Sequence, residues 1–105
     1  MTRYSCQQFA NVTVAYVAGG QTVASLLTAV GRALDASCRK LSLYNIGQSN
    51  LYVDRTTARL DTNSLILMPN SAIVIPGTFN DLERIAVNPV GMGDTIQLNV
   101  MQEAD

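Results

Sequence analysis

The spacing of apolar residues changes along the chain from a period of two to a helical period and back. In 11–17, Val12 and Val14 alternate with smaller or polar residues, which is typical of a β-strand. In 22–35 the apolar residues recur at helical spacing and Thr22 is a suitable N-cap, so this segment is predicted to form one α-helix. The apolar face of that helix comprises Val23, Leu26, Leu27, Val30, Ala33 and Leu34. Further short strands are predicted at 41–46, 51–53, 64–68, 72–75, 82–87 and 95–101.

Glycine, proline and asparagine separate the predicted strands. The segment 47–50 contains Gly47 and Asn50, so 41–46 and 51–53 are predicted to pair across it as a hairpin. Turn signals recur about every 8–12 residues, as in sandwiches, and a single helix is too few for alternating βαβ units. The sequence therefore predicts a mainly β fold. It is an antiparallel β-sandwich or jelly roll of about seven to eight short strands, with one inserted α-helix.

Length and composition predict one domain with an unusually uncharged surface. The 105 residues fit a single domain, 1–105, in which residues 1–10 are predicted to form an N-terminal arm. Apolar residues make up 48% of the chain and charged residues only 14%, against roughly 25% in an average soluble protein. We expect part of the apolar surface to be buried against other subunits, in a homo-oligomer for which a trimer is the leading expectation.

The charge pattern argues against nucleic acid and membranes as partners. The net charge is −1, and the densest basic positions, Arg39-Lys40 and the Arg55/Arg59 pair, do not form a basic stripe. No stretch approaches the roughly 18 apolar residues of a membrane span. The polar N-terminus lacks the apolar segment of a signal peptide, which predicts folding in a cytoplasm. In that compartment Cys6 and Cys38 are expected to be reduced thiols.

The residues needed for common catalytic sites are missing. The chain has no histidine, which excludes Ser-His-Asp and Cys-His arrangements, and its two cysteines alone cannot close a four-ligand zinc site. The carboxylates near predicted turns, Asp54, Asp61, Asp81 and Glu83, are interpreted as solvated turn acids rather than catalytic groups. We therefore expect no enzymatic activity, no metal and no cofactor.

Several segments share their order of strand and turn residues with a known class of proteins. The segments are Leu43 to Val53, Leu67 to Pro76, the Leu82-Glu83-Arg84-Ile85 stretch and the closing Ile96 to Val100. Together they resemble small structural proteins of tailed bacteriophages. The resemblance spans mainly 41–102 and implies a capsid decoration (cement) protein with a jelly-roll-like β-sandwich. Such a protein is made and folded in the host cytoplasm, joins the virion, and binds between subunits of a major capsid protein.

Candidate contact residues follow from size, lack of charge and predicted position. Tyr4, Phe9, Phe79 and Met92 are large, uncharged and in predicted arms or loops, and Gln97 lies on the polar, uncharged face of the last predicted strand. Two alternatives stay open, a small ligand- or carbohydrate-binding β-sandwich module and a tail or connector structural subunit. The absence of tryptophan, with only four tyrosines and two phenylalanines, disfavours sugar platforms.

Overall fold

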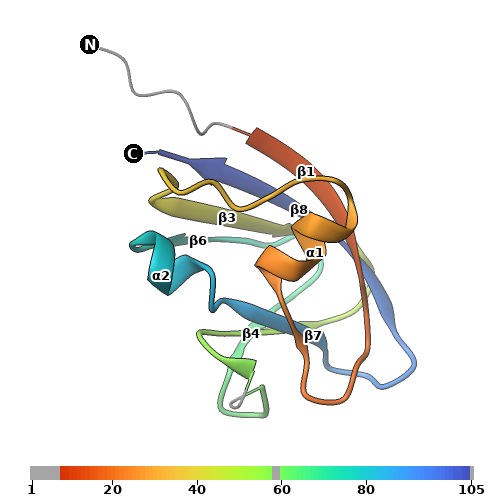
Figure 1. The fold of residues 1–105 in the computed structure, drawn as a ribbon. Coiled ribbons are helices and arrows are strands. Elements are labelled where there is room, and N and C mark those ends of the chain that lie inside the picture. Colours follow the sequence, from red (N-terminus) through yellow and green to blue (C-terminus); the bar gives the residue numbers. More distant parts are fainter. Residues whose placement is uncertain (1–7, 58–59, 105) are drawn as a thin grey trace.

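The computed structural model describes residues 8–57 and 60–104, and within these residues the chain forms two antiparallel four-stranded sheets (Figure 1). The sheets pack face to face as a β-sandwich with two short helices, so the predicted fold class is confirmed. In chain order the elements are β1 (Gln8–Ala15), β2 (Gln21–Thr22), α1 (Val23–Ala29), β3 (Lys40–Asn45), β4 (Leu51–Asp54), β5 (Leu65–Leu67), β6 (Ala72–Pro76), α2 (Phe79–Leu82), β7 (Ala86–Pro89) and β8 (Thr95–Glu103).

The strand pairing is that of a rolled-up hairpin. β1 pairs with β8, β2 with β7, β3 with β6 and β4 with β5, which are the pairs of one long antiparallel hairpin. Rolling this hairpin places β8 beside β3 and β7 beside β4. The result is sheet A, with the order β1-β8-β3-β6, and sheet B, with the order β2-β7-β4-β5. Eight strands connected in this way form a jelly roll.

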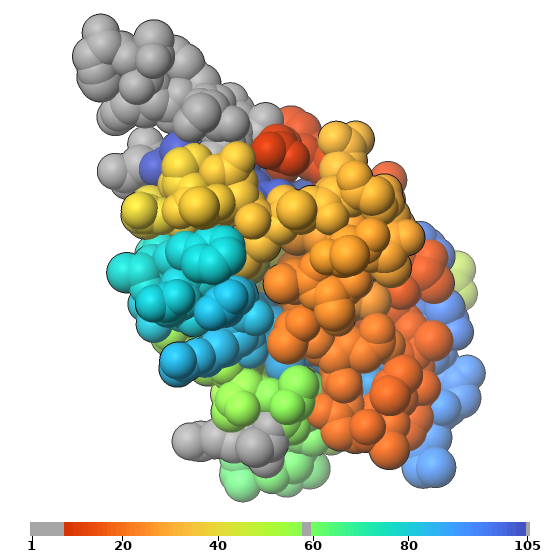
Figure 2. Space-filling view, viewed as in Figure 1, coloured from red at the N-terminus to blue at the C-terminus, as the bar shows by residue number. Residues whose placement is uncertain are grey.

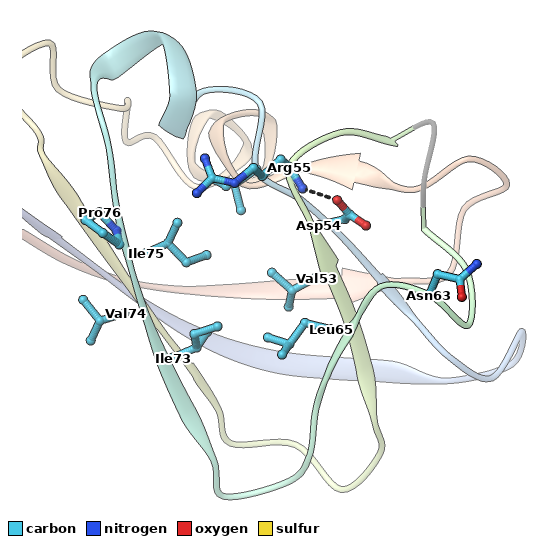
Figure 3. A pocket seen from close by; sticks show the side chains of 10 residues that line it. Val53, Asp54, Arg55, Asn63, Leu65, Ile73, Val74, Ile75 and Pro76 are labelled. Carbon is cyan, nitrogen blue, oxygen red and sulfur yellow. Dashed lines mark hydrogen bonds between the residues drawn. The ribbon is translucent and has the colours of Figure 1, made fainter.

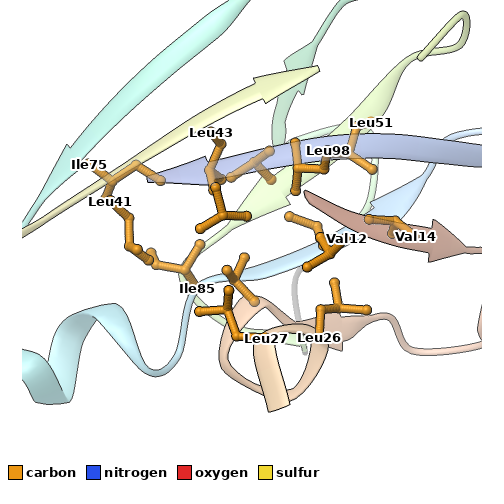
Figure 4. Packing of buried hydrophobic residues seen from close by; sticks show 14 of the residues in the cluster. Val12, Val14, Leu26, Leu27, Leu41, Leu43, Leu51, Ile75, Ile85 and Leu98 are labelled. Carbon is orange, nitrogen blue, oxygen red and sulfur yellow. The ribbon is translucent and has the colours of Figure 1, made fainter. Parts of the chain in front are cut away.

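One apolar core lies between the sheets. Alternate residues of β1, β3 and β8 point into it, and α1 adds Val23, Leu26 and Leu27 (Figure 4). Each of these leucines exposes 5% or less of its surface, so each contributes on the order of 1.5–3 kcal/mol through burial. The core therefore holds the two sheets and the helix as one unit.

Helix α1 ends six residues before the predicted limit of 35, because a glycine stops it. Gly31 has a φ of 77°, its N–H donates to the Thr28 oxygen at 3.0 Å, and the N–H of Arg32 donates to the Leu27 oxygen at 2.9 Å. This pair of bonds is the Schellman motif, in which a glycine just past the helix adopts the left-handed conformation. Leu34 still packs against the core, but from a loop rather than from the helix face assigned by the sequence.

The predicted strand 82–87 is also wrong in its limits. Thr78 and Asp81 form a capping box, with the Asp81 N–H bonded to the Thr78 hydroxyl and the Asp81 carboxylate accepting from the Thr78 N–H, and this nucleates α2. The strand β7 starts only at Ala86. Every residue of β7 is buried, so Ala86 is not the outward-facing residue that alternation predicted.

The predicted hairpin between 41–46 and 51–53 does not form. β3 belongs to sheet A and β4 to sheet B, so segment 46–50 carries the chain from one sheet to the other. The buried amide of Asn45 organises this crossing. Its Nδ2 donates to the Ser49 oxygen at 2.9 Å and the Leu67 oxygen at 3.0 Å, while its Oδ1 accepts from the Gly47 N–H at 2.9 Å. The amide both donates to and accepts from backbone groups, so it supplies hydrogen bonds to a segment that has no neighbouring strand to pair with.

Two further buried amides hold long connections in the same way. Asn88 accepts from the Val17 N–H at 3.1 Å and donates to the Val17 oxygen at 3.0 Å, which fixes the link between β1 and β2. Gln102 accepts from the Asp35 N–H at 2.8 Å and donates to the Ala33 oxygen at 2.9 Å, which fixes the loop after α1. Among the described residues, every buried side-chain nitrogen or oxygen has a hydrogen-bond partner.

Candidate interaction surface

The side of sheet A that points away from sheet B, called here the outer face, carries very little charge. Its members are the outward-pointing residues of the four strands, and Lys40 and Glu103, paired across β3 and β8 at one end, supply its charges. By contrast, β7 in sheet B is buried on both sides. The remaining outer-face residues are Phe9, Asn11, Thr13 and Ala15 of β1, Thr95, Gln97, Asn99 and Met101 of β8, Ser42 and Tyr44 of β3, and Ala72, Val74 and Pro76 of β6.

The strand register sorts the outer face into cross-strand rows. In one row Phe9 lies beside Met101, Met101 beside Ser42, and Ser42 beside Val74. Phe9 and Val74, at the two edges of the sheet, are 58% and 57% exposed. In the next row Asn11, Asn99, Tyr44 and Ala72 are neighbours. Apolar side chains therefore reach solvent across the full width of sheet A.

Polar side chains on the outer face bond to one another. The Nδ2 of Asn99 donates to the Oδ1 of Asn11 at 2.8 Å, and the Nε2 of Gln97 donates to the Oγ1 of Thr13 at 3.0 Å. Such cross-strand pairs stabilise the sheet and hold the amides in one orientation. Because part of their bonding capacity is already satisfied, covering them with another protein costs less desolvation than covering unbonded amides.

The structure brings together two of the five predicted contact residues. Phe9 and Gln97 both lie on the outer face, and Phe9 belongs to β1 rather than to the predicted N-terminal arm. Phe79 is half-buried and opens α2, so its predicted place in a loop is wrong. Met92 lies in the loop between β7 and β8, as predicted, and is 76% exposed. Tyr4 lies outside the described residues.

Phe9 and Gln97 share one surface with residues that were not predicted as contact residues. Asn11, Asn99, Tyr44 and Val74 were not singled out, although each alternates with buried residues in its strand. That alternation places Asn99 on the same face of the last strand as Gln97, and it could have assigned the other three to outward-facing positions. Their place on a shared face depends on which strands are neighbours.

A groove opens beside the edge of sheet A, between β6 and the strands β4 and β5 (Figure 3). It encloses about 430 Å³. Asp54 and Arg55 lie on its rim, where the Asp54 carboxylate accepts from the Ser64 hydroxyl at 2.8 Å and from the backbone N–H of Arg55 at 2.6 Å. Its apolar lining residues are Val53, Leu65, Ile73, Val74, Ile75, Pro76 and Ile85.

The carboxylates with perturbed acidity belong to turns. The Ser37 hydroxyl and backbone N–H, bonded to Asp35, lower the pKa of that carboxyl. The Thr78 backbone N–H and hydroxyl do the same for the pKa of Asp81. A general acid working near neutral pH needs a raised pKa, so both shifts run against that role. Among residues 8–57 and 60–104, no three cysteine, aspartate or glutamate side chains cluster as metal ligands would.

The expected thiol state of the two cysteines stays a prediction. Cys38 is buried and its sulfur donates to the Lys40 oxygen at 3.1 Å, whereas Cys6 lies outside the described residues. Within the part of the chain that the structure describes, no helix has the length and apolar character needed to cross a membrane.

Comparison with known proteins identifies no relative. No family model, curated protein or solved structure matches the chain.

Proposed function

We propose that this protein is a non-enzymatic structural subunit of a virus particle, which decorates or cements a capsid by binding between capsid subunits. The observation that carries the proposal is the outer face of sheet A, a broad exposed surface with few charges: Lys40 and Glu103 at one end, and Arg32 beside Asn11 and Asn99 at the β1 edge. The jelly-roll pairing adds support by analogy, since this architecture occurs in viral capsid proteins as well as in lectins and cupins. Fold alone does not set function, so the proposed function rests on the outer face rather than on the jelly-roll architecture.

The proposed mechanism is burial of the outer face against uncharged surface of the major capsid protein. Phe9 supplies apolar area, and the bonded amides of Gln97 and Asn99 are covered at low desolvation cost. Because each bound copy binds the assembled shell and not its separate subunits, binding stabilises the shell by mass action. A contact surface with so few charges also predicts that particle binding changes little between low and high salt.

The test compares tagged copies of the protein expressed in the host during particle production, with particles separated on a density gradient. The wild-type protein is expected in the particle fraction. Gln97→Asp places a charge in the middle of the outer face and should reduce recovery there by about tenfold or more, because the charge must be desolvated unpaired.

Asn80→Asp is the control, because it also replaces an uncharged amide with a carboxylate, at an exposed position of α2 outside sheet A. Circular dichroism should show both variants folded. Wild-type protein absent from the particle fraction would contradict the proposed function. Equal recovery of the two variants would show that the outer face is not the contact surface.

A further inference from the structure

In the described part of the chain, one open side of the sandwich is covered by a helix, and the other is not. On the side of β1 and β2, helix α1 contacts both strands and buries Val23, Leu26 and Leu27 against the core. In Figure 2 this helix and the loop after it, in orange, form a continuous surface. On the opposite side, between β6 and β5, the groove of about 430 Å³ stays open. Exposed apolar residues gather on these two edge strands and next to them, namely Leu65, Ile66, Met68 and Val74.

The edge strand β6 offers backbone groups for a further strand. The N–H of Asn45 bonds to the Ser71 oxygen and the N–H of Gly77 to the Arg39 oxygen, so odd-numbered residues of this segment point their backbone groups at β3. Ala72, Val74 and Pro76 therefore point theirs away from the sheet. Among the described residues, no strand pairs with β6 on that side.

This edge carries only a small part of the usual protection against pairing. Natural edge strands carry charged residues, bulges or prolines that block a second strand. The five residues of β6, Ala72 to Pro76, include no charge, and the proline stands at the last position. The partner that fits such an edge is an uncharged apolar strand, and β6 itself is one, since all five of its residues are apolar.

We propose that β6 is a dimerisation strand, which pairs antiparallel with β6 of a second copy about a two-fold axis at Val74. In this register the N–H and C=O of Val74 bond to the same groups of its symmetry mate. The N–H of Ala72 in each copy bonds to the Pro76 oxygen of the other copy. The prolines lack N–H groups, so they remove two bonds from the ladder and leave four.

The side chains of β6 fit this pairing on both faces. Ile73 and Ile75 point toward Val53 and Leu65 in Figure 3, so the same isoleucines of a second copy would enter the open groove. The Val74 side chain points to the other side, onto the outer face. Pairing through β6 would join sheet A of the two copies into one eight-stranded sheet with a continuous outer face. The groove rim carries Asp54 and Arg55, whose charges cancel, so two identical rims meet without net repulsion. This contact closes on two copies and predicts a dimer, not the trimer favoured by composition.

The experiment measures mass and backbone protection of the whole chain in solution. Native mass spectrometry and light scattering should find a dimer, and hydrogen exchange should find the Ala72 and Val74 amides protected. Val74→Lys sets two like charges opposite each other at the axis, while its side chain stays in solvent. It should weaken dimerisation by about tenfold or more and speed exchange of the Ala72 amide to a similar extent.

Val30→Lys is the matched control, since Val30 is 45% exposed at the end of α1, far from β6 in the fold, and it should stay dimeric. A wild-type monomer, a trimer, or a Val74→Lys dimer of unchanged affinity would overturn the strand pairing. Gln97→Asp separates the two proposals. A dimer that survives this change but fails to bind particles supports both, whereas dissociation of the dimer by Gln97→Asp would place the dimer contact on the outer face and overturn pairing through β6.

Discussion

Replacing Asn45 should destabilise the fold more than replacing any exposed asparagine, because its amide is fully buried and joins three backbone groups. The side chain has no solvent exposure and makes hydrogen bonds to Gly47, Ser49 and Leu67. A net contribution of about 0.5–1.5 kcal/mol for each of the three bonds gives a loss of about 1.5–4.5 kcal/mol for Asn45→Ala. The crossing from sheet A to sheet B would lose the side chain that organises it.

Asn45→Asp should cost more than Asn45→Ala. The carboxylate would replace the Nδ2 donor and face the Ser49 and Leu67 carbonyl oxygens, which now lie 2.9 and 3.0 Å from Nδ2, so a buried negative charge would meet two acceptors. An unpaired buried charge is among the few changes that exceed about 4 kcal/mol.

The assay is urea unfolding followed by circular dichroism, at one protein concentration so that oligomerisation does not shift the midpoints. Asn11→Ala is the control. It removes a single exposed hydrogen bond on β1 and should change the free energy of unfolding by less than about 0.5 kcal/mol. If Asn45→Ala and Asn11→Ala lower stability equally, the buried amide does not hold the crossing and this reasoning is wrong.

Three further predictions concern the core, acid stability and the thiols. Leu27→Ala should cost about 2–5 kcal/mol because Leu27 is buried, whereas exposed Arg32→Ala should cost less than about 0.5 kcal/mol, as thermal unfolding would show. The pKa of Asp81 is lower in the folded state, so its contribution to stability is present above the unfolded value of about 3.9 and is lost as the pH falls through the folded value. Asp81→Asn should therefore lessen the loss of stability measured below about pH 4, and an unchanged pH profile would contradict the capping role. Alkylation without reductant, read by mass spectrometry, should label both Cys6 and Cys38 once the chain is unfolded, and an unlabelled pair would reveal a disulfide.

Alternation predicted the strands well because the period of two is a local property. The last strand shows this, since Ile96, Leu98 and Val100 are buried and Thr95 and Gln97 are exposed, as the sequence indicated. Pairing was harder to predict because it depends on distant contacts. A turn rich in glycine and asparagine suits both a hairpin and a crossing between sheets. The bond that distinguishes them joins Asn45 to Leu67, 22 residues away.

Helix limits failed for a different reason. Gly31 and the capping pair Thr78 and Asp81 are visible in the sequence as a stop and a start signal. The helical spacing of Leu34 outweighed Gly31 in the prediction, yet Leu34 reaches the core from a loop held by Gln102. The spacing of apolar residues is the same whether the last of them lies on a helix face or in a loop that packs against the core, so spacing alone does not set the end of the helix.

The candidate surface was the least predictable feature. Size and lack of charge selected Phe9 and Met92, which the fold places on sheet A and in the loop between β7 and β8. Gln97 was selected from alternation and lies on the outer face. Its neighbours Thr13 and Asn99 belong to that face only through the register of β1 with β8. A surface made by several strands becomes visible when their order is known.

The most direct test of the account is the protein content of purified virus particles. Particles from the host that carries this gene would be purified on successive gradients, and their proteins would be quantified by mass spectrometry against the major capsid protein. A decoration or cement subunit should be present at a fixed ratio to that protein, and the ratio should persist after a high-salt wash because the outer face binds with little charge. Particles that lack this chain, or lose it in salt, would contradict the account.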